Sequence, residues 1–326
     1  EIFFEDLGLR EPDYYLGVET SSLGVVLGEI LEKIEVVLVK EKPDAVLILG
    51  DTNSSIAAFL AKRMGIPVYH MEAGNRSFDE NVPEETNRRM IDHVADFNLA
   101  YSELARKNLL SEGLNARQVM VTGSPMAEVL MFYSNQIEAS QVLKNTNLER
   151  NKYVLVSAHR QETVDSEVRL RELVKTLEQV HSKWQLPVLV STHPRTRARL
   201  SKLADLSTKP GIIWHNPFNY SDYVTLQKNA FCTISDSGTI SEEASILGFP
   251  AVTIRDSMER PEALESGAII MAGLNADMVI RAMEVAIGCP SHSVPDEYKV
   301  DDFSRRVLGI VLSTYWAHKR WLGLQS

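Results

Sequence analysis

The sequence predicts an α/β protein made of two halves, each built around a buried parallel sheet. Short apolar runs alternate with longer segments of helical periodicity along the whole chain, which is the pattern of successive βα units. The length of 326 residues fits two domains, because one domain takes roughly 150 residues. Apolar residues make up 44% of the chain and charged residues 24%, which indicates a folded protein and excludes disordered and fibrous classes.

The first half has predicted elements in a regular order. Its short apolar runs are expected to be buried strands, at 45–49, 67–71 and 119–122. The periodic segments are expected to be helices, at 23–40, 54–64, 84–94 and 102–111. The third of these begins with Pro83 followed by two acidic residues, which is ordinary chemistry for the first turn of a helix.

The second half repeats this alternation. Its strands are predicted at 153–157, 188–192, 231–235, 251–254 and 268–271, and its helices at 166–182, 221–228, 239–247 and 276–288. A polar stretch with little pattern, 141–151, is the predicted linker. We therefore expect an amino-terminal domain at 1–145 and a carboxy-terminal domain at 146–302. The segment 303–322 has apolar residues at helical spacing, so 303–326 is expected to form a helix that returns to the first domain.

Charge and cysteine content exclude several classes of protein. The net charge is −10, from 34 basic and 44 acidic residues, which leaves no general cationic field for nucleic acid or an anionic membrane. Cys232 and Cys289 form neither a disulfide framework nor a metal cluster. No uncharged apolar stretch reaches the roughly 18 residues of a membrane span, and the chain opens at Glu1 without a basic signal region. A reducing, cytoplasmic location is the expectation.

Polar residues follow the predicted strands where a ligand of an open parallel sheet would bind. In the first half, Asp51 and Glu72 each follow a strand. Asp51 alone is typical of a helix cap, but two neighbouring carboxylates shift each other's pKa and can divide acid and base roles. Glu84 and Arg88 lie four residues apart on the next helix.

The second half carries cations and a small-residue turn at its strand ends. His159 and Arg160 follow one strand, and Arg255 follows another. The segment Ser235-Asp-Ser237-Gly238 leads from a strand into a helix, so free N–H groups at the helix start are expected to bind phosphate. Glu243, inside that helix, is a candidate acceptor for ribose hydroxyls. Each of these features also has an ordinary structural interpretation as a capping loop or a buried polar residue.

Several common motifs are missing from the sequence. It contains no G-x-G-x-x-G, no G-x-x-x-x-G-K-[ST], no H-E-x-x-H and no D-x-D. These absences argue against a nicotinamide oxidoreductase and against a metal-dependent sugar transferase.

Taken together and in order, the motifs resemble those of the non-hydrolysing UDP-N-acetylglucosamine 2-epimerases. The resemblance rests on Gly50-Asp-Thr, His70-Met-Glu-Ala-Gly, Pro83-Glu-Glu-x-Asn-Arg, His159-Arg, His193-Pro, Ser235-Asp-Ser-Gly-x-Ile-x-Glu-Glu and Arg255-Asp-x-x-Glu-Arg-Pro-Glu. It implies the GT-B type of fold, with two Rossmann-like lobes and a cleft between them. Segments such as Ser191-Thr-His-Pro-Arg-Thr-Arg look more like the UDP-N-acetyl-L-fucosamine synthase branch, which acts on UDP-2-acetamido-2,6-dideoxy-L-talose for capsule and O-antigen synthesis. UDP-GlcNAc remains the alternative substrate.

The resemblance also implies a reaction and roles for the candidate residues. UDP leaves C1 as C2 loses its proton, and UDP then adds back with a proton delivered to the opposite face, so no cofactor and no metal are needed. Asp51, Glu72 and Glu84 correspond to the acid/base carboxylates, and His159 to a histidine on the diphosphate side. The residues expected to bind substrate are Arg88, Arg160, Tyr223, Ser237, Gly238, Glu243 and Arg255.

Three further expectations follow from the resemblance. Family members are typically homodimers. They also carry an earlier strand and a Gly-Thr-Arg-Pro-Glu turn, so the first domain is expected to lack its first strand. A metal-independent glycosyltransferase of the same fold, or a non-catalytic protein that binds nucleotide sugars, remain alternative functions.

Overall fold

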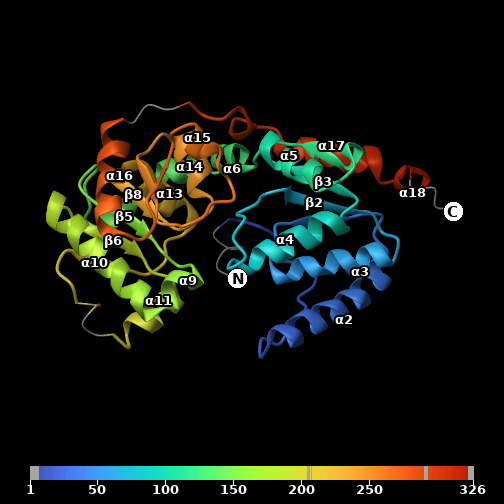
Figure 1. Ribbon diagram of the computed structural model, residues 1–326, viewed down its shortest axis with the longest axis horizontal. Coiled ribbons are helices and arrows are strands. Elements are labelled where there is room, and N and C mark those ends of the chain that lie inside the picture. The colour runs from blue at the N-terminus through green and yellow to red at the C-terminus, as the bar shows by residue number, and fades with distance from the viewer. Residues whose placement is uncertain (1–6, 204–205, 207, 290–292, 322–326) are drawn as a thin grey trace. The chain divides into compact units, whose positions relative to one another are not determined.

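The computed structural model describes residues 7–203, 206, 208–289 and 293–321, and the chain divides into two compact units (Figure 1). Residues 10–125 and the segment from Val300 form the amino-terminal lobe, whereas 126–299 form the carboxy-terminal lobe together with the described residues of 1–9. Each lobe contains one all-parallel sheet. The predicted fold class, an α/β protein with two parallel-sheet lobes, is confirmed.

The amino-terminal lobe has four parallel strands in the order β1-β2-β3-β4. They are β1 Val46–Leu49, β2 Val68–Ala73, β3 Phe97–Ala100 and β4 Val119–Val121. The helices are α2 Leu23–Glu41, α3 Ala57–Arg63, α4 Pro83–Val94 and α5 Glu103–Ser111, with short 3₁₀ turns at Asn53–Ile56 and Ala116–Gln118. Side-chain oxygens of Ser22 and Ser102 accept backbone N–H groups at the starts of α2 and α5, as helix N-caps do.

The final segment of the chain completes this lobe. Helix α17, Phe303–Thr314, packs Phe303 and Val307 against Leu99 and Tyr101 at the end of β3. A short helix, α18 His318–Trp321, follows, so the predicted single helix is interrupted. The end of the predicted segment, residues 322–326, lies outside the described residues.

The carboxy-terminal lobe has six parallel strands in the order β10-β9-β8-β5-β6-β7. They are β5 Val154–Ser157, β6 Val188–Ser191, β7 Ile212–His215, β8 Cys232–Ser235, β9 Ala251–Thr253 and β10 Ile270–Met271. The central strands are largely buried, as in a sheet covered on both faces. From the neighbouring strands β5 and β8, successive strands of the chain are added in opposite directions across the sheet. Ligands of open α/β sheets bind at such a switch point.

Helices of very different lengths surround this sheet. They are α6 Met126–Phe132, α7 Ser134–Ala139, α8 Val142–Asn145, α9 Gln161–Val164, α10 Glu167–Trp184, α11 Pro194–Leu200, α13 Tyr220–Asn229, α14 Ile240–Leu247, α15 Glu262–Glu265 and α16 Ala276–Gly288, with a 3₁₀ turn at Asp296–Tyr298. The long amphipathic α10 contributes Leu170, Leu173 and Leu177 to the principal core.

The division of the chain differs from the expected boundary. It falls between Pro125 and Met126 rather than between residues 145 and 146, because α6 and α7 place Leu130, Tyr133 and Ile137 in a cluster with Val224 of α13. The stretch predicted to be a linker includes α8, whose Val142 is 2% exposed in another cluster of the same lobe. The predicted linker has a mostly polar composition, so its buried apolar positions were not recognised from the sequence.

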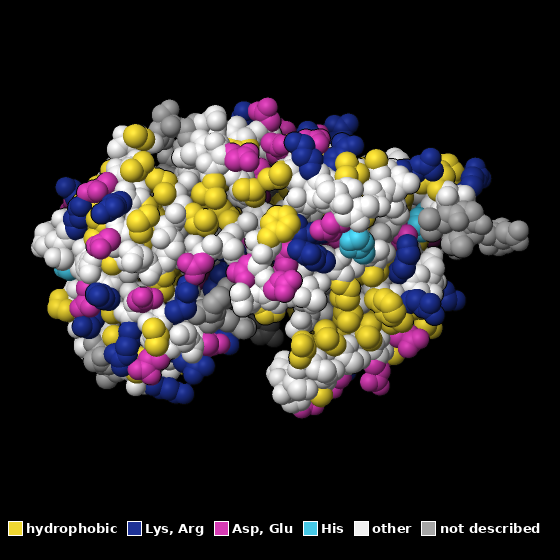
Figure 2. Space-filling view, viewed as in Figure 1, with side chains coloured by type: hydrophobic (Ala, Val, Ile, Leu, Met, Phe, Trp, Pro, Cys, Tyr) yellow, Lys and Arg dark blue, Asp and Glu magenta, His cyan; other side chains and the backbone are white. Residues whose placement is uncertain are grey.

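One face of the amino-terminal lobe exposes apolar side chains. Figure 2 shows hydrophobic groups over α2 and α3, where Val36, Val39 and Phe59 are exposed. Along β1, which is an edge strand of its sheet, Leu47 and Leu49 are exposed as well.

Candidate active site

Two strand ends bring the first group of predicted residues together. Gly50 follows β1 with a left-handed φ of +71°, and its N–H donates to the Met71 carbonyl of β2 at 3.2 Å. A Cβ at Gly50 would lie 3.5 Å from Oε2 of Glu72, so the turn leading to Asp51 touches the Glu72 carboxylate. The structure therefore places the predicted pair at one edge of the sheet, beyond the carboxyl ends of β1 and β2.

Asp51 forms an ion pair with Arg88. The guanidinium donates to Oδ2 of Asp51 from Nε at 2.8 Å and Nη2 at 2.6 Å, and only 18% of the Asp51 side chain and 6% of the Arg88 side chain are exposed. Burial raises the pKa of Asp51; Arg88 opposes this shift, and the charges of Glu72 and Glu84 add to it. A carboxylate with a raised pKa beside other carboxylates is suited to proton transfer.

Glu72 has a strained backbone. Its φ is +69°, a conformation that costs a non-glycine residue on the order of 1–3 kcal/mol. Its Oε1 accepts a hydrogen bond from Nδ2 of Asn75 at 3.3 Å. Gly74, between them, must be glycine, since a Cβ there would lie 2.3 Å from the backbone oxygen of Ala105.

A network of charged residues close to this end of the sheet was missed by the sequence prediction. The side chains of His70, Arg76 and Asp92 are fully buried, whereas that of Glu112 is 23% exposed. His70 lies with Nδ1 2.8 Å from Oδ1 of Asp92 and Nε2 3.0 Å from the Gly50 carbonyl. Arg76 donates to the other Asp92 oxygen at 2.7 Å and to both oxygens of Glu112 at 2.7 and 2.6 Å. The network fixes the turn that precedes Asp51. The sequence shows charged residues here, but it does not show which of them are buried.

The contacts made by the residues of helix α4 differ from the prediction. Arg88 contacts Glu85, from Nη1 to Oε2 at 2.6 Å, whereas Glu84 is exposed. The same Glu85 oxygen accepts from the backbone and hydroxyl of Ser77, both at 3.0 Å. Asn87 donates to the Asp51 carbonyl at 3.0 Å. Glu85 and Asn87 thus also belong to the polar cluster around Asp51 and Arg88, and their place in Pro-Glu-Glu-x-Asn-Arg was the available signal.

In the carboxy-terminal lobe, Asp236 joins the ends of β5 and β8. Its Oδ2 accepts from the backbone N–H groups of His159 and Arg160, both at 2.9 Å, while Oδ1 lies 3.3 Å from Nδ1 of His159. Burial raises the pKa of Asp236, and the charge of His159 opposes this shift. The carboxylate holds the His159 backbone in place and leaves its imidazole half-exposed.

Arg255 provides a buried cation at the start of α14. Its side chain is 4% exposed, and Nη2 contacts Oε1 of Glu259 at 2.5 Å. Nη1 is buried without a hydrogen-bond partner among the described residues, and a Cβ at Gly238 would lie 3.7 Å from it. A buried N–H with no acceptor, beside a small-residue turn into a helix, is suited to an anionic oxygen. Arg160 contacts the same Glu259 oxygen at 3.4 Å.

The remaining predicted binding residues lie around α13 and α14. Glu243 is 6% exposed, accepts from Nε2 of Gln227 at 2.6 Å, and has its pKa raised by burial. Burial also raises the pKa of Tyr223, with further contributions from the charges of Glu243 and Asp236. The Ser237 hydroxyl lies 3.0 Å from that of Thr239. The ends of β5, β8 and β9 thus gather these side chains at the switch point of the sheet.

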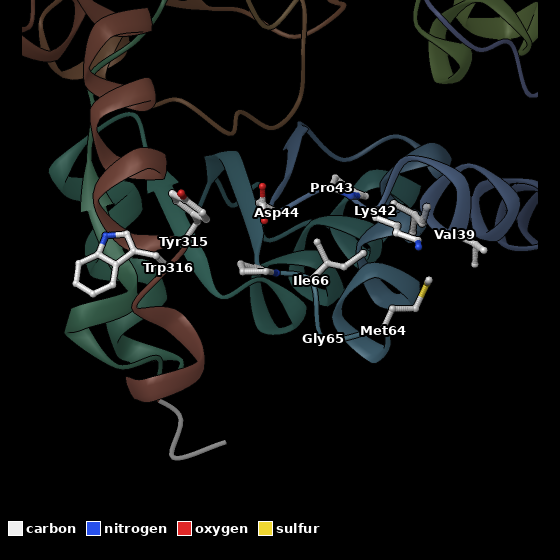
Figure 3. Close-up of a pocket in the computed structure, with 11 residues that line it drawn as sticks. Val39, Lys42, Pro43, Asp44, Met64, Gly65, Ile66, Tyr315 and Trp316 are labelled. Atoms are coloured by element: carbon white, nitrogen blue, oxygen red, sulfur yellow. The ribbon is translucent and has the colours of Figure 1, made fainter. Parts of the chain in front are cut away.

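Other parts of the described structure contribute no competing site. Among the residues described, no cluster of His, Cys, Asp or Glu could hold a metal ion, and no helix is long and apolar enough to cross a membrane. A pocket of about 630 Å³, which Figure 3 shows, is lined by residues that precede β1 and β2, including Lys42 and Ile66, and by Tyr315 and Trp316. It lies at the opposite strand ends from Asp51 and Glu72, whereas ligands of open sheets bind at the carboxyl ends.

Comparison with known proteins decides the family. The model of the family described as UDP-N-acetylglucosamine 2-epimerase matches residues 1–312. The chain belongs to this family. It is therefore an enzyme of the isomerase class, and the predicted resemblance to this family is confirmed, although the match does not distinguish an L-fucosamine branch.

Relatives and solved structures agree with the family assignment. The UDP-N-acetylglucosamine 2-epimerase of Methanocaldococcus jannaschii is 38% identical over 294 residues, which are 88% of this chain and 80% of that protein. A UDP-2,3-diacetamido-2,3-dideoxy-D-glucuronate 2-epimerase of Pseudomonas aeruginosa is 34% identical, with the same coverage of 88% and 80%. The solved UDP-N-acetylglucosamine 2-epimerase of Rickettsia bellii has a TM-score of 0.90 and 42% identity, covering 98% of this chain and 86% of its own.

A liganded structure within this 2-epimerase family is also similar. The M. jannaschii UDP-GlcNAc 2-epimerase in complex with UDP-GlcNAc and UDP has a TM-score of 0.89 and 36% identity, covering 96% of this chain and 87% of its own. The roles assigned above to individual residues remain predictions, which the following section develops.

Proposed function

We propose that this chain inverts C2 of a UDP-N-acetylhexosamine by eliminating UDP and adding it back. The proposed substrate is UDP-2-acetamido-2,6-dideoxy-L-talose, converted to UDP-N-acetyl-L-fucosamine for capsule or O-antigen synthesis in the cytoplasm. Support for this branch comes from the Ser191-Thr-His-Pro-Arg-Thr-Arg segment. UDP-GlcNAc, converted to UDP-ManNAc, is the alternative substrate.

The reaction requires two kinds of group. A C2–H beside an acetamido substituent is too weak an acid for a carboxylate to remove unaided. If the C1–O bond to UDP breaks as a base takes the C2 proton, the electron pair of the C–H bond forms a C1=C2 double bond and the charge leaves on the diphosphate. Re-addition of UDP to C1, with a proton delivered to the other face of C2, gives the epimer without net oxidation.

The amino-terminal lobe supplies the proposed acids and bases. Asp51, Glu72 and Glu84 are the proposed proton-transfer groups, and Arg88 holds Asp51 in position at 2.6–2.8 Å. Burial raises the pKa of Asp51, and the charges of Glu72 and Glu84 add to this shift. Such a difference favours unequal protonation of the three carboxylates, so that one accepts a proton while another donates one.

The residues proposed to bind UDP belong to the carboxy-terminal lobe. Arg255, Arg160 and the turn at Ser237 and Gly238 are proposed to bind the diphosphate, and His159 to stabilise the charge that develops as UDP leaves. Glu243 is proposed to accept hydrogen bonds from ribose hydroxyls, and Tyr223 to lie beside uracil. The proposal requires both lobes to act on one substrate molecule, and we propose a homodimer as the active form.

One observation carries the choice of reaction. The Asp51–Arg88 pair lies within the electrostatic influence of two further carboxylates, and a protein that only binds or transfers a nucleotide sugar has no need of three neighbouring carboxylates. The proposal predicts that the purified chain exchanges the C2 hydrogen of its substrate with solvent.

The test is incubation of each UDP-sugar in heavy water, followed by mass spectrometry and proton NMR. C2 deuterium incorporation with formation of the epimer is the expected result. Faster exchange with the L-talose sugar than with UDP-GlcNAc would support the proposed branch, and the reverse would reject it. Binding without exchange, or sugar transfer to an acceptor without exchange, would contradict the proposed reaction.

A further inference from the structure

The loop between β2 and α4 contains an unexplained backbone feature. Six non-glycine residues of the described chain have positive φ. Two of them, Lys42 and Gln185, are left-handed C-caps of long helices, and two are asparagines, which adopt this conformation readily. The other two, Glu72 at +69° and Phe78 at +53°, lie six positions apart around this loop. One is a proposed catalytic carboxylate, and the other is an aromatic residue without an assigned role.

Phe78 is exposed although its neighbours are held firmly. Its side chain is 72% exposed. On one side, the backbone and hydroxyl of Ser77 donate to Glu85, which also binds Arg88, the partner of Asp51. On the other side, Oδ1 of Asp79 accepts from the backbone of Asn81 at 3.0 Å and from its side chain at 2.8 Å.

These contacts hold a bulky apolar ring in solvent at a strained backbone position. A single exposed apolar residue needs no explanation by itself. A left-handed φ, however, is unfavourable for an aromatic residue and persists where surrounding contacts impose it, most often at functional sites. Here the contacts that impose it run through Glu85 and Arg88 to Asp51.

We propose that Phe78 contacts the sugar of the substrate, with its ring packed on an apolar patch of the hexose. Such a patch is either a face of ring C–H groups or the methyl group of a 6-deoxy sugar, and both present the apolar surface that an aromatic face covers. This inference deepens the proposed function and rests on it. Phe78 contributes no proton transfer; it orients C2 relative to the carboxylates.

Three variants test whether the Phe78 ring contacts the sugar or only stabilises the folded protein. Phe78→Asn removes the ring but tolerates the left-handed backbone, Phe78→Tyr keeps the ring, and Phe59→Ala removes a partly exposed phenylalanine from α3 of the same lobe. For each variant, KM and kcat of epimerisation are measured with both UDP-sugars, together with the dissociation constant of UDP and the melting temperature.

We expect Phe78→Asn to raise KM about tenfold, equivalent to one lost apolar contact, with UDP affinity within about twofold of wild type because UDP lacks the sugar. Its melting temperature stays the same or rises, since strain is relieved. Phe78→Tyr retains KM within about threefold, and Phe59→Ala resembles wild type. An increase in KM with both sugars indicates a ring-face contact, and an increase confined to the 6-deoxy sugar indicates a methyl contact; either supports the inference.

An unchanged KM in Phe78→Asn with both sugars would overturn the inference, and so would a lowered melting temperature together with equal losses of sugar and UDP binding. Failure of the proposed function is a separate outcome, because it appears in the wild-type chain as absence of C2 exchange before any variant is made.

Discussion

The charge of Arg88 influences the pKa of its neighbour Asp51. Arg88 is buried between Asp51 and Glu85, at 2.6 Å from each, and its charge opposes the burial that raises the pKa of Asp51. Removing the cation should therefore raise the pKa of this carboxyl further, because the protonated form no longer competes with an ion pair.

Arg88→Met tests this electrostatic role. If Asp51 must be ionised to take the C2 proton, activity falls as the pH drops through the pKa of Asp51. We expect the acidic limb of the kcat/KM profile to move to higher pH in Arg88→Met. Arg89→Met is the matched control, because Arg89 contacts Glu85 at 3.2 Å, whereas the charges that shift the pKa of Asp51 most are those of Arg88, Glu72 and Glu84. An acidic limb that stays in place, or moves to lower pH, would contradict the assignment.

The sequence predicted the candidate residues better than their contacts. Strand-end positions indicated Asp51 and Glu72, since the carboxyl ends of parallel strands meet at one edge of a sheet. The burial of Asp92 and Arg76 was not predictable, because many charged residues have the same local pattern and only tertiary packing determines which of them pair. Spacing suggested that Arg88 would face Glu84, whereas its guanidinium reaches Glu85 and Asp51.

At the scale of elements, strong hydrophobic patterns were predicted well and short irregular ones were missed. All eight predicted strands are present with small differences at their ends. The two missed strands are β3, which carries Asn98 at a buried position, and β7, which is half-exposed at the edge of its sheet. Asn98 interrupts the apolar run of β3, and the run of β7 is only three residues long before His215, so neither gives the longer apolar run that indicates a buried parallel strand.

Helix α17 allows an element-level prediction. It covers the end of β3 with Phe303, which is 6% exposed and packs edge-on against Tyr101 at 5.6 Å between ring centroids. Phe303→Ala should cost about 3–5 kcal/mol of unfolding free energy, as removal of a buried phenylalanine does. We expect faster hydrogen exchange in the peptides of β3 and β4.

The matched control is Leu308→Ala on the same helix, since Leu308 is 57% exposed and its loss should leave exchange unchanged. Equal effects of the two substitutions would contradict a stabilising role for the buried Phe303 side chain.

At the scale of the whole molecule, we propose that the two lobes contribute different groups to one reaction. The cluster of carboxylates belongs to the amino-terminal lobe, and the proposed anion-binding residues around Arg255 and Gly238 belong to the carboxy-terminal lobe. Each group is assembled from residues of its own lobe, so a substitution in one should leave the folding of the other intact. Binding of UDP and removal of the C2 proton should therefore be separable by mutation.

The most direct test measures UDP affinity and C2 deuterium exchange side by side in Glu72→Gln and Glu243→Ala. Glu72→Gln should lose exchange while the dissociation constant of UDP stays within about twofold of wild type, because the amide keeps the shape of the side chain but is a far weaker base. Glu243→Ala should weaken UDP binding by about tenfold or more, since it removes a buried charged acceptor. Loss of UDP binding in Glu72→Gln, or unchanged exchange in that variant, would contradict the division of the reaction between the two lobes.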